Sequence, residues 1–537
     1  INNFNADFSD NIRLKIDNVR LVENSSAIPT LFSDGMIFQQ NKPMNLWGNG
    51  AYGEPVIATL KKSDTVLETK KTIVSENGKW QLCFDKRKGG YDKYQIELSV
   101  GAEKRTINDV VIGELWLAGG QSNMELQVYK DIDAEKLIDG ADNSNIRVFL
   151  EPTYPYGKNE KQPIQPKNDV PGAYWGYGNN PVNVGGMSSL AYTFAKQLQQ
   201  KLDVPVGIIN SAIGGTVIEG WLSKVAVDGD SEVKSKLKEY KLYYDETNWP
   251  DIAGKMSTLY NQKIGPLEGM NIAGVIWYQG ESNGKYSEIY DLELDLLKRS
   301  WSKAFGYENG DMPFIFTQVA PYYHHTKTDD NQLGYLSMYM ERAWRLSENK
   351  NTAMLTIYDL PLEHVKNGKS ADPIHPRTKV PVGERFAQSA LNMVYGGGKV
   401  YTAPVYKSAE VKNGAVYVTF DYTGDGLKAI SNSGDIHGFT VAGADGVYVN
   451  AKAQIIDKNT VKVWNDRVEA PENVIYAFDN YNQSANLANS EGIPASPFRT
   501  IKLNDSTSKP DASIKYFNSQ DWMNADKDAW VFDLEYT

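Results

Sequence analysis

Short apolar segments alternate with helical stretches between residue 109 and about residue 398, and this alternation constrains the fold more than any other feature. Strands and helices that alternate along a chain predict an α/β layer fold. The expected strands are residues 114–118, 205–210, 273–278 and 313–318, and the expected helices include residues 189–202 and 289–305. We therefore expect the centre of the chain to form one α/β unit.

Regions with a β pattern flank this unit on both sides. Before it, β-branched or aromatic runs are separated by turn pairs such as Asn77-Gly78, which is typical of a β-sandwich. The β pattern returns after Val400. Because 537 residues far exceed the ~100–200 residues of a usual domain, several cores are expected. The expected divisions are an N-terminal segment and β-sandwich domain at 1–108, an α/β domain at 109–400, a second β domain at 401–505 and a polar tail at 506–537.

The composition excludes several classes of function. Apolar residues make up 41% of the chain and charged residues 23%, and no segment approaches the ~18 continuous apolar residues of a membrane span. The net charge of −11 argues against nucleic acid or an anionic membrane as partner, because phosphate binding requires clustered Lys and Arg. We expect no nucleic acid, no membrane insertion, and a neutral or weakly charged substrate.

One cysteine and the start of the chain bear on the cell compartment. The single cysteine, Cys83, excludes an intrachain disulfide framework and a cysteine-based zinc cluster, and we expect it to be a small buried residue. The sequence starts at Ile1, without an initiator Met or a hydrophobic leader, which suits a mature form trimmed of its signal peptide. A secreted or periplasmic protein is the interpretation that this start favours.

Three glycine-rich corners follow three of the expected strands. They are Gly119-Gly120-Gln121-Ser122-Asn123-Met124, Ala212-Ile213-Gly214-Gly215-Thr216 and Gln279-Gly280-Glu281-Ser282-Asn283. At the first corner, glycines permit a tight strand-to-helix turn that exposes Ser122 at a sheet edge, where N–H groups can receive an oxyanion. Ser122 is therefore a candidate nucleophile, with a helix N-cap as the structural alternative. Corners at the carboxyl ends of strands are expected to converge on one crevice.

A serine nucleophile needs a base, and the chain has five histidines: His324, His325, His364, His375 and His437. His375 lies in Asp372-Pro373-Ile374-His375-Pro376, where prolines stiffen the loop and Asp372 can hold the imidazole tautomer. The His324-His325 pair could bind metal, but no His-Glu-x-x-His helix or carboxylate cluster completes such a site. His375 is the predicted base, and His437 is expected to be structural.

Two further motifs compete with this interpretation. Gly48-Asn49-Gly50-Ala51-Tyr52-Gly53 matches a dinucleotide fingerprint, but a β-branched strand follows it instead of a helix, so we expect a turn. Gly280-Glu281-Ser282-Asn283-Gly284 matches the nucleophile elbow of α/β-hydrolases, with a strand before it and a helical stretch after it. Ser282 therefore remains a rival nucleophile, because the order Ser282, Asp372, His375 also suits that fold.

The corners together resemble the sialate O-acetylesterase family of the SGNH hydrolase superfamily. The resemblance rests on four blocks in order, and it extends to Leu31-Phe32-Ser33-Asp34-Gly35-Met36 near the start and to residues 489–500 near the end. The four blocks are Gly120-Gln121-Ser122-Asn123-Met124, Gly214-Gly215-Thr216 with Ile218-Glu219-Gly220-Trp221, Trp277-Tyr278-Gln279-Gly280-Glu281-Ser282-Asn283, and residues 372–379. The resemblance implies an SGNH three-layer α/β/α domain flanked by β-sandwich-like domains.

The resemblance also implies roles for individual residues. Ser122 is preferred over Ser282 as nucleophile, with His375 as base and Asp372 as its orienting partner. The oxyanion would be bound by the N–H groups of Ser122 and Gly215 and by the side chain of Gln279. Substrate contacts are expected from Gln121, Asn123, Glu281 and Trp221. The chain departs from the family pattern at Ser282, where an Asn is more usual in the superfamily, and at Glu341-Arg342-Ala343-Trp344, where Arg-Glu-Ala-Gln is expected.

The predicted function is that of a serine carboxylic-ester hydrolase that removes acetyl groups from sugars, most specifically a sialate O-acetylesterase. The expected partner is an acetylated sugar or glycan, and no metal or cofactor is expected. An acetyl xylan or mannan esterase on the same site is the main alternative. A Ser282 α/β-hydrolase and a non-catalytic carbohydrate-binding protein are the others, and the intact Ser122, Asp372 and His375 set disfavours the latter.

Hydrolysis of an aryl acetate should survive exhaustive chelation. The expected electrophilic group is a set of N–H donors and not a Lewis acid, so removal of divalent metal should leave the rate unchanged. Initial rates measured before and after EDTA treatment check this. Loss of activity that zinc restores would instead support the His324-His325 pair as metal ligands.

Overall fold

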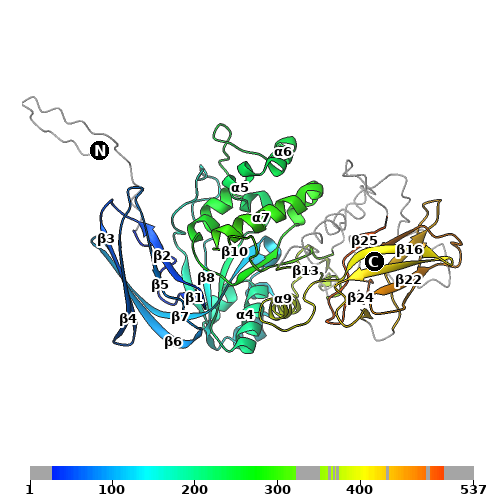
Figure 1. Ribbon diagram of the computed structural model, residues 1–537, viewed down its shortest axis with the longest axis horizontal. Helices are drawn as coiled ribbons and strands as arrows, with labels where there is room; N and C mark the ends of the chain where they lie inside the picture. The colour runs from blue at the N-terminus through cyan, green and yellow to red at the C-terminus, as the bar shows by residue number, and fades with distance from the viewer. Residues whose placement is uncertain are drawn as a thin grey trace, which may run out of the picture.

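A seven-stranded sheet forms the centre of the protein (Figure 1). The computed structural model describes residues 27–321, 351–360, 365–366, 369–370, 374–430, 434–478 and 484–500. Six of the strands are parallel, and only the edge strand β9 is antiparallel to its neighbour. In spatial order the strands are β13 (Thr352–Leu355), β12 (Phe314–Thr317), β11 (Gly274–Tyr278), β7 (Glu103–Gly120), β10 (Val206–Ala212), β8 (Asn143–Leu150) and β9 (Tyr174–Gly178).

Helices cover both faces of this sheet, as Figure 1 shows. On one side α4 (Ser189–Leu202) packs against α9 (Val380–Met393), and on the other lie α5 (Lys224–Gly229), α6 (Ser231–Glu239) and α7 (Tyr290–Ala304). Helix α4 has the predicted bounds because Ser188 caps its first turn by accepting from the Ala191 N–H, and Asp203 ends it in the left-handed conformation. The predicted three-layer α/β/α fold is confirmed.

The remaining elements around the central sheet are short helices and one antiparallel pair of two-residue strands. No helix among the described residues is long and apolar enough to span a bilayer. These short elements are α1 (Ser122–Glu125), η1 (Val128–Lys130), α2 (Ala134–Asp139), α3 (Pro181–Gly186), η2 (Ile218–Trp221), η3 (Tyr260–Ile264), η4 (Gly265–Leu267), η5 (Glu281–Ile289), β14 (Val365–Lys366) and β15 (Lys369–Ser370).

Strand β7 links the N-terminal β region to the central sheet. Its first half pairs with β6 and its second half with β10 and β11, so the predicted division at residue 108 falls inside one continuous strand. The alternating burial of β5 directs Cys83 outward, and the expectation that this cysteine is buried is therefore wrong. The other N-terminal strands are β1 (Ile37–Gln39), β2 (Met44–Asn49), β3 (Pro55–Lys62), β4 (Thr65–Ile73), β5 (Lys79–Phe84) and β6 (Gly90–Val100).

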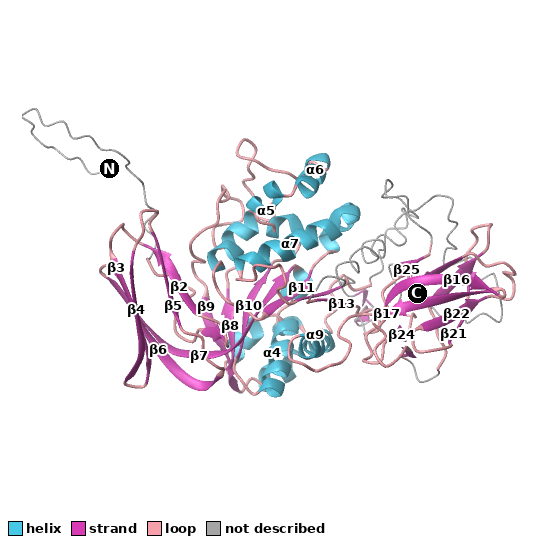
Figure 2. Cartoon of the chain, viewed as in Figure 1, coloured by secondary structure: helices cyan, strands magenta, loops and turns pink. Residues whose placement is uncertain are grey.

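The C-terminal β region consists of two four-stranded sheets that enclose their own apolar core (Figure 2). It contacts the central sheet through residues 489–500: Ser496 Oγ accepts from Gln318 Nε2 at 2.8 Å, and the Pro494 carbonyl accepts from Thr356 Oγ1. The first sheet is β16 (Val405–Lys412), β17 (Ala415–Asp421), β22 (Thr460–Trp464) and β21 (Lys452–Ile455), and the second is β20 (Val449–Asn450), β19 (Phe439–Ala442), β23 (Asn473–Tyr476) and β25 (Phe498–Arg499), with a separate pair β18 (Lys428–Ala429) and β24 (Leu487–Ala488).

Replacing Gly120 with alanine should destabilise the fold. Gly120 has φ of +143°, and a Cβ there would lie 2.1 Å from the Tyr278 carbonyl oxygen of the neighbouring strand. We expect a loss of roughly 2 to 3 kcal/mol in the free energy of unfolding, measured by urea titration. Gly229→Ala is the control, because a Cβ at that helical position meets nothing within 4 Å. Equal stabilities of the two variants would contradict the steric argument.

Candidate active site

The structure brings Ser122 and His375 together at the carboxyl edge of the sheet. Ser122 is the first residue of α1, directly after β7, and His375 lies on the loop before α9. The Nε2 atom of His375 is 2.8 Å from the Ser122 Oγ, and both residues are half-buried. A serine hydroxyl bonded to an imidazole nitrogen is the arrangement in which the imidazole can take the proton of a nucleophile. Asp372, the predicted third member, lies outside the described residues.

His375 pairs with Ser122 and not with the rival Ser282. The backbone N–H of Ser282 donates to the Oε1 of Gln121 at 3.2 Å, so this serine lies next to the turn that carries Ser122. His437 lies in the C-terminal β region, where its backbone N–H donates to Asn486. His324, His325, His364 and residues 341–344 fall outside the part of the chain that the structure describes.

The first and second corners meet at Ser122. A Cβ on Gly214 would lie 3.3 Å from the Ser122 Cβ, and the Gly214 N–H donates to the Glu125 carboxylate at 2.7 Å. Gly215 is exposed, with φ of +73°. Among the described residues, no backbone carbonyl accepts from the N–H of Ser122 or of Gly215. Both N–H groups predicted as oxyanion donors thus have no backbone acceptor in the part of the chain that the structure describes.

Gln279 has a different position from the one that the sequence suggested. It is fully buried, and its Nε2 donates to Gln121 Oε1, to the Thr216 carbonyl and to Asn283 Oδ1 at 2.7 to 3.1 Å. Tyr290 donates its hydroxyl to Gln279 Oε1 at 2.7 Å. Because an amide has only two hydrogens, protein acceptors occupy both. The assignment of Gln279 as an oxyanion donor is therefore not supported; its amide joins the three corners to one another.

Three of the predicted substrate contacts also lie inside the protein. Gln121 is 2% exposed, and its Oε1 accepts from the N–H groups of Gly280 and Ser282. Trp221 has no exposed surface, because it packs edge-on against Trp277 and donates its indole N–H to the Thr216 hydroxyl. Asn123 is likewise fully buried. Polar and aromatic residues near a corner suggested ligand contact, but in the fold these side chains fasten the corners together.

Asn123 connects three loops. Its Nδ2 donates to the Glu281 carboxylate at 2.5 Å and to the Ile374 carbonyl at 2.8 Å, and its Oδ1 accepts from Lys379 Nζ at 2.7 Å. Asn123 follows the nucleophile Ser122, and Ile374 precedes His375. The amide therefore fixes the histidine loop relative to the nucleophile turn.

Glu281 places a buried carboxylate close to His375. Burial raises the pKa of this carboxyl, and the hydrogen bond from Asn123 and the nearby charges of Lys379 and His375 oppose the rise. Its Oε2 has no hydrogen-bond partner among the described residues. The fourth predicted substrate contact is thus a buried carboxylate that bonds Asn123 and interacts electrostatically with His375.

Lys379 lies at the end of the fourth block, and no role was predicted for it. Its amine is buried, and this burial lowers the pKa of Lys379 to about 7 against the opposing charges of Glu281 and Asp131. The backbone N–H of Lys379 donates to the Asp131 carboxylate, which also accepts from the Ser189 hydroxyl. Lysine side chains are usually exposed to solvent. The one signal in the sequence that could have indicated a role for Lys379 is its position within the fourth block.

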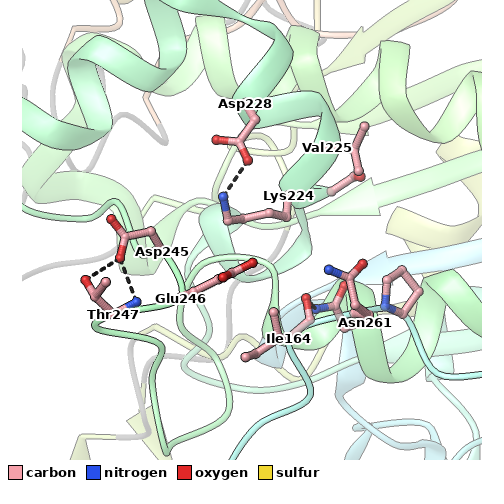
Figure 3. A pocket seen from close by; sticks show the side chains of 11 residues that line it. Ile164, Lys224, Val225, Asp228, Asp245, Glu246, Thr247 and Asn261 are labelled. Atoms are coloured by element: carbon pink, nitrogen blue, oxygen red, sulfur yellow. Dashed lines mark hydrogen bonds and ion pairs between the residues drawn. The ribbon is translucent and has the colours of Figure 1, made fainter. Parts of the chain in front are cut away.

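Charged, polar and apolar side chains line a cavity of about 400 Å³ (Figure 3). Three carboxylates line it against one amine: Lys224 donates to Asp228, and Asp245 accepts from Thr247. None of the predicted site residues lines this cavity. Its lining residues are Ile164, Gln165, Pro166, Ser223, Lys224, Val225, Asp228, Asp245, Glu246, Thr247 and Asn261.

A family model described as carbohydrate esterase, sialic acid-specific acetylesterase, matches residues 112–392, more than half of the 537 residues. The chain belongs to this family. Both corners that meet at Ser122, the third corner and His375 fall within the matched residues. Family membership confirms the prediction of a carboxylic-ester hydrolase.

Curated relatives and a solved structure extend the likeness beyond the matched segment. Sialate O-acetylesterase from Mus musculus is 27% identical over 448 residues, which is 74% of this chain and 80% of the mouse protein. The Homo sapiens sialate O-acetylesterase is 26% identical over 374 residues, covering 65% of this chain and 67% of the human one. A carbohydrate acetylesterase from Xanthomonas citri superposes with a TM-score of 0.74 at 29% identity, covering 89% of this chain and 99% of the other.

Proposed function

We propose that this family member is a carbohydrate O-acetylesterase in which Ser122 is the nucleophile and His375 the general base. The 2.8 Å contact between His375 Nε2 and Ser122 Oγ carries the assignment, because it places an acceptor for the hydroxyl proton next to the oxygen that attacks the ester. The family and the relatives support acetyl esters of sugars as the substrate class.

The reaction follows from this geometry in two steps. The Ser122 proton moves to His375 Nε2 as Oγ bonds to the acetyl carbon, and the N–H groups of Ser122 and Gly215 bind the developing oxyanion. Each such donor lowers the barrier by about 3 to 4 kcal/mol. The bond to the sugar oxygen then breaks as His375 protonates that oxygen. Water attacks the acetyl-enzyme with His375 again as base, and acetate leaves.

A carboxylate is required to orient His375 and to stabilise it when it is protonated. The sequence assigns this role to Asp372, three residues before the histidine, and that assignment is part of the proposal. The Glu281 carboxylate interacts electrostatically with the imidazole from within the same site.

Within this class we propose a sialate O-acetylesterase, on the names of the mammalian relatives. An esterase for another acetylated sugar, such as xylan or mannan, is the alternative, because the Xanthomonas citri protein covers more of the chain and is named only as a carbohydrate acetylesterase. We extend the proposal to a secreted or periplasmic location, where polymeric glycans are found.

Ser122→Ala should abolish hydrolysis of p-nitrophenyl acetate, because the atom that forms the acetyl-enzyme is removed. Ser282→Ala is the matched control and should keep measurable activity, because only the backbone of Ser282 is bonded to the nucleophile turn. Initial rates of folded variants, together with peptide mapping of a fluorophosphonate adduct, decide between the serines. A dead but folded Ser282 variant beside an active Ser122 variant would overturn the proposal.

Acetyl esters should be preferred over butyryl esters by at least about tenfold in kcat/KM. Bulky side chains are fully buried beneath the corners, so the acyl site cannot deepen to hold longer chains; these are Met124, Ile218, Trp221 and Trp277. A panel of p-nitrophenyl esters measures this preference. Acetate release from 9-O-acetyl sialic acid and from acetylated xylan and mannan then identifies the sugar. Higher efficiency on butyryl esters would exclude a carbohydrate acetylesterase.

A further inference from the structure

Lys379 has its amine sealed inside the protein, within hydrogen-bond reach of the residue next to the nucleophile. The side chain is 1% exposed, and Nζ lies 2.7 Å from Asn123 Oδ1 and 5.4 Å from the centre of the Tyr278 ring. Burying an amine is costly unless it makes compensating interactions. An apolar side chain of similar length would avoid this cost. The amine is therefore expected to have a structural or catalytic role at this position.

The bond from Lys379 reinforces the orientation of the Asn123 amide that its two acceptors, Glu281 and the Ile374 carbonyl, require. With Oδ1 held by the amine, Nδ2 must point away from it, toward the Glu281 carboxylate and the Ile374 carbonyl that it contacts. Without the amine, Oδ1 would be a buried acceptor without its partner, and the cost of leaving it unpaired would weaken the hold of the amide on the Ile374 carbonyl. The loop that carries His375 would then be held less firmly against the nucleophile turn.

We propose that Lys379 is a positioning residue which, through Asn123, sets the distance and orientation between Ser122 Oγ and His375 Nε2. The inference rests on the proposed function, since it assigns a role within the same site. Lys379 touches neither the hydroxyl nor the imidazole; it acts only by holding the amide between them.

The charges around the amine support this role. Glu281 and Asp131 are the carboxylates whose charges act on it, and Tyr278 faces it with a ring. Because the pKa of Lys379 is about 7, the amine changes charge near neutral pH, and its hydrogen bond to Asn123 is strongest when it is protonated. An arginine at this position would keep its charge throughout the working pH range.

The test compares wild type with Lys379→Met, Lys379→Arg and Lys379→Gln on p-nitrophenyl acetate. Lys379→Met should lower kcat by roughly 10- to 100-fold with KM changed by less than about threefold, because a misplaced base affects the chemical step and not binding. The rate at which a fluorophosphonate labels Ser122 should fall by a similar factor. Lys379→Arg should recover part of both losses, because it restores a charged donor.

Lys298→Met is the matched control for loss of a buried amine. Lys298 is 4% exposed and donates to the Thr352 hydroxyl at 2.6 Å, between α7 and β13. This variant should lose stability in urea titrations while its kcat and labelling rate stay within about twofold of wild type. A purely structural role for Lys379 would give the same pattern in Lys379→Met.

The outcomes separate the inference from the function on which it rests. Wild-type protein without acetate release, or an active Ser122→Ala variant, would remove the proposed function. An active wild type with a folded Lys379→Met variant of unchanged kcat and labelling rate would overturn the positioning role alone. If Lys379→Met does not fold, Lys379→Gln decides: a loss in kcat of at least about fivefold at unchanged KM supports the role, and an unchanged kcat overturns it.

Discussion

Buried side-chain amides hold the carboxyl edge of the sheet together, and the site depends on them. Where strands end and corners begin, backbone groups enter the interior without ladder partners, and each unpaired group is costly. Gln121, Asn123, Gln279 and Asn283 supply the missing partners. Gln121 accepts from two N–H groups of the third corner, while Asn283 accepts from the Ile218 N–H of the second. The positions of Ser122 and His375 follow from these bonds.

The nucleophile also gains rigidity from the strand that carries it. Strand β7 pairs with β6 in the N-terminal region and with β10 and β11 in the central sheet, so Ser122 emerges from a segment held on both sides. The buried Arg147, which lies in β8, donates to Asp109 of β7 and to the Gly35 carbonyl. These bonds reinforce the junction between the two regions. A site on such a segment keeps its geometry better than one on a free loop. Gly35 belongs to the motif at residues 31–36, so this motif is tied to the strand that carries the nucleophile.

Charge distribution bears on the sugar that the enzyme accepts. The net charge of −11 led to the expectation of a neutral or weakly charged substrate, whereas a sialic acid carries a carboxylate. The carboxylates of Asp228, Asp245 and Glu246 line the cavity of Figure 3, and Asp228 is paired with the amines of Lys224 and Lys234. The choice between sialic acid and a neutral polymer therefore concerns charge as much as shape.

The sequence by itself determined the α/β layer order, the turn that carries Ser122 and the loop that carries His375, because glycines and prolines act on their own backbone and a strand or helix pattern is local. It could not determine which polar side chains face a ligand and which face one another. Gln279, Trp221 and Asn123 were predicted to contact the oxyanion or the substrate, but their side chains are buried. No role was predicted for Lys379. Asn123 meets the Ile374 carbonyl across 251 positions of chain, and only the tertiary structure brings such partners together.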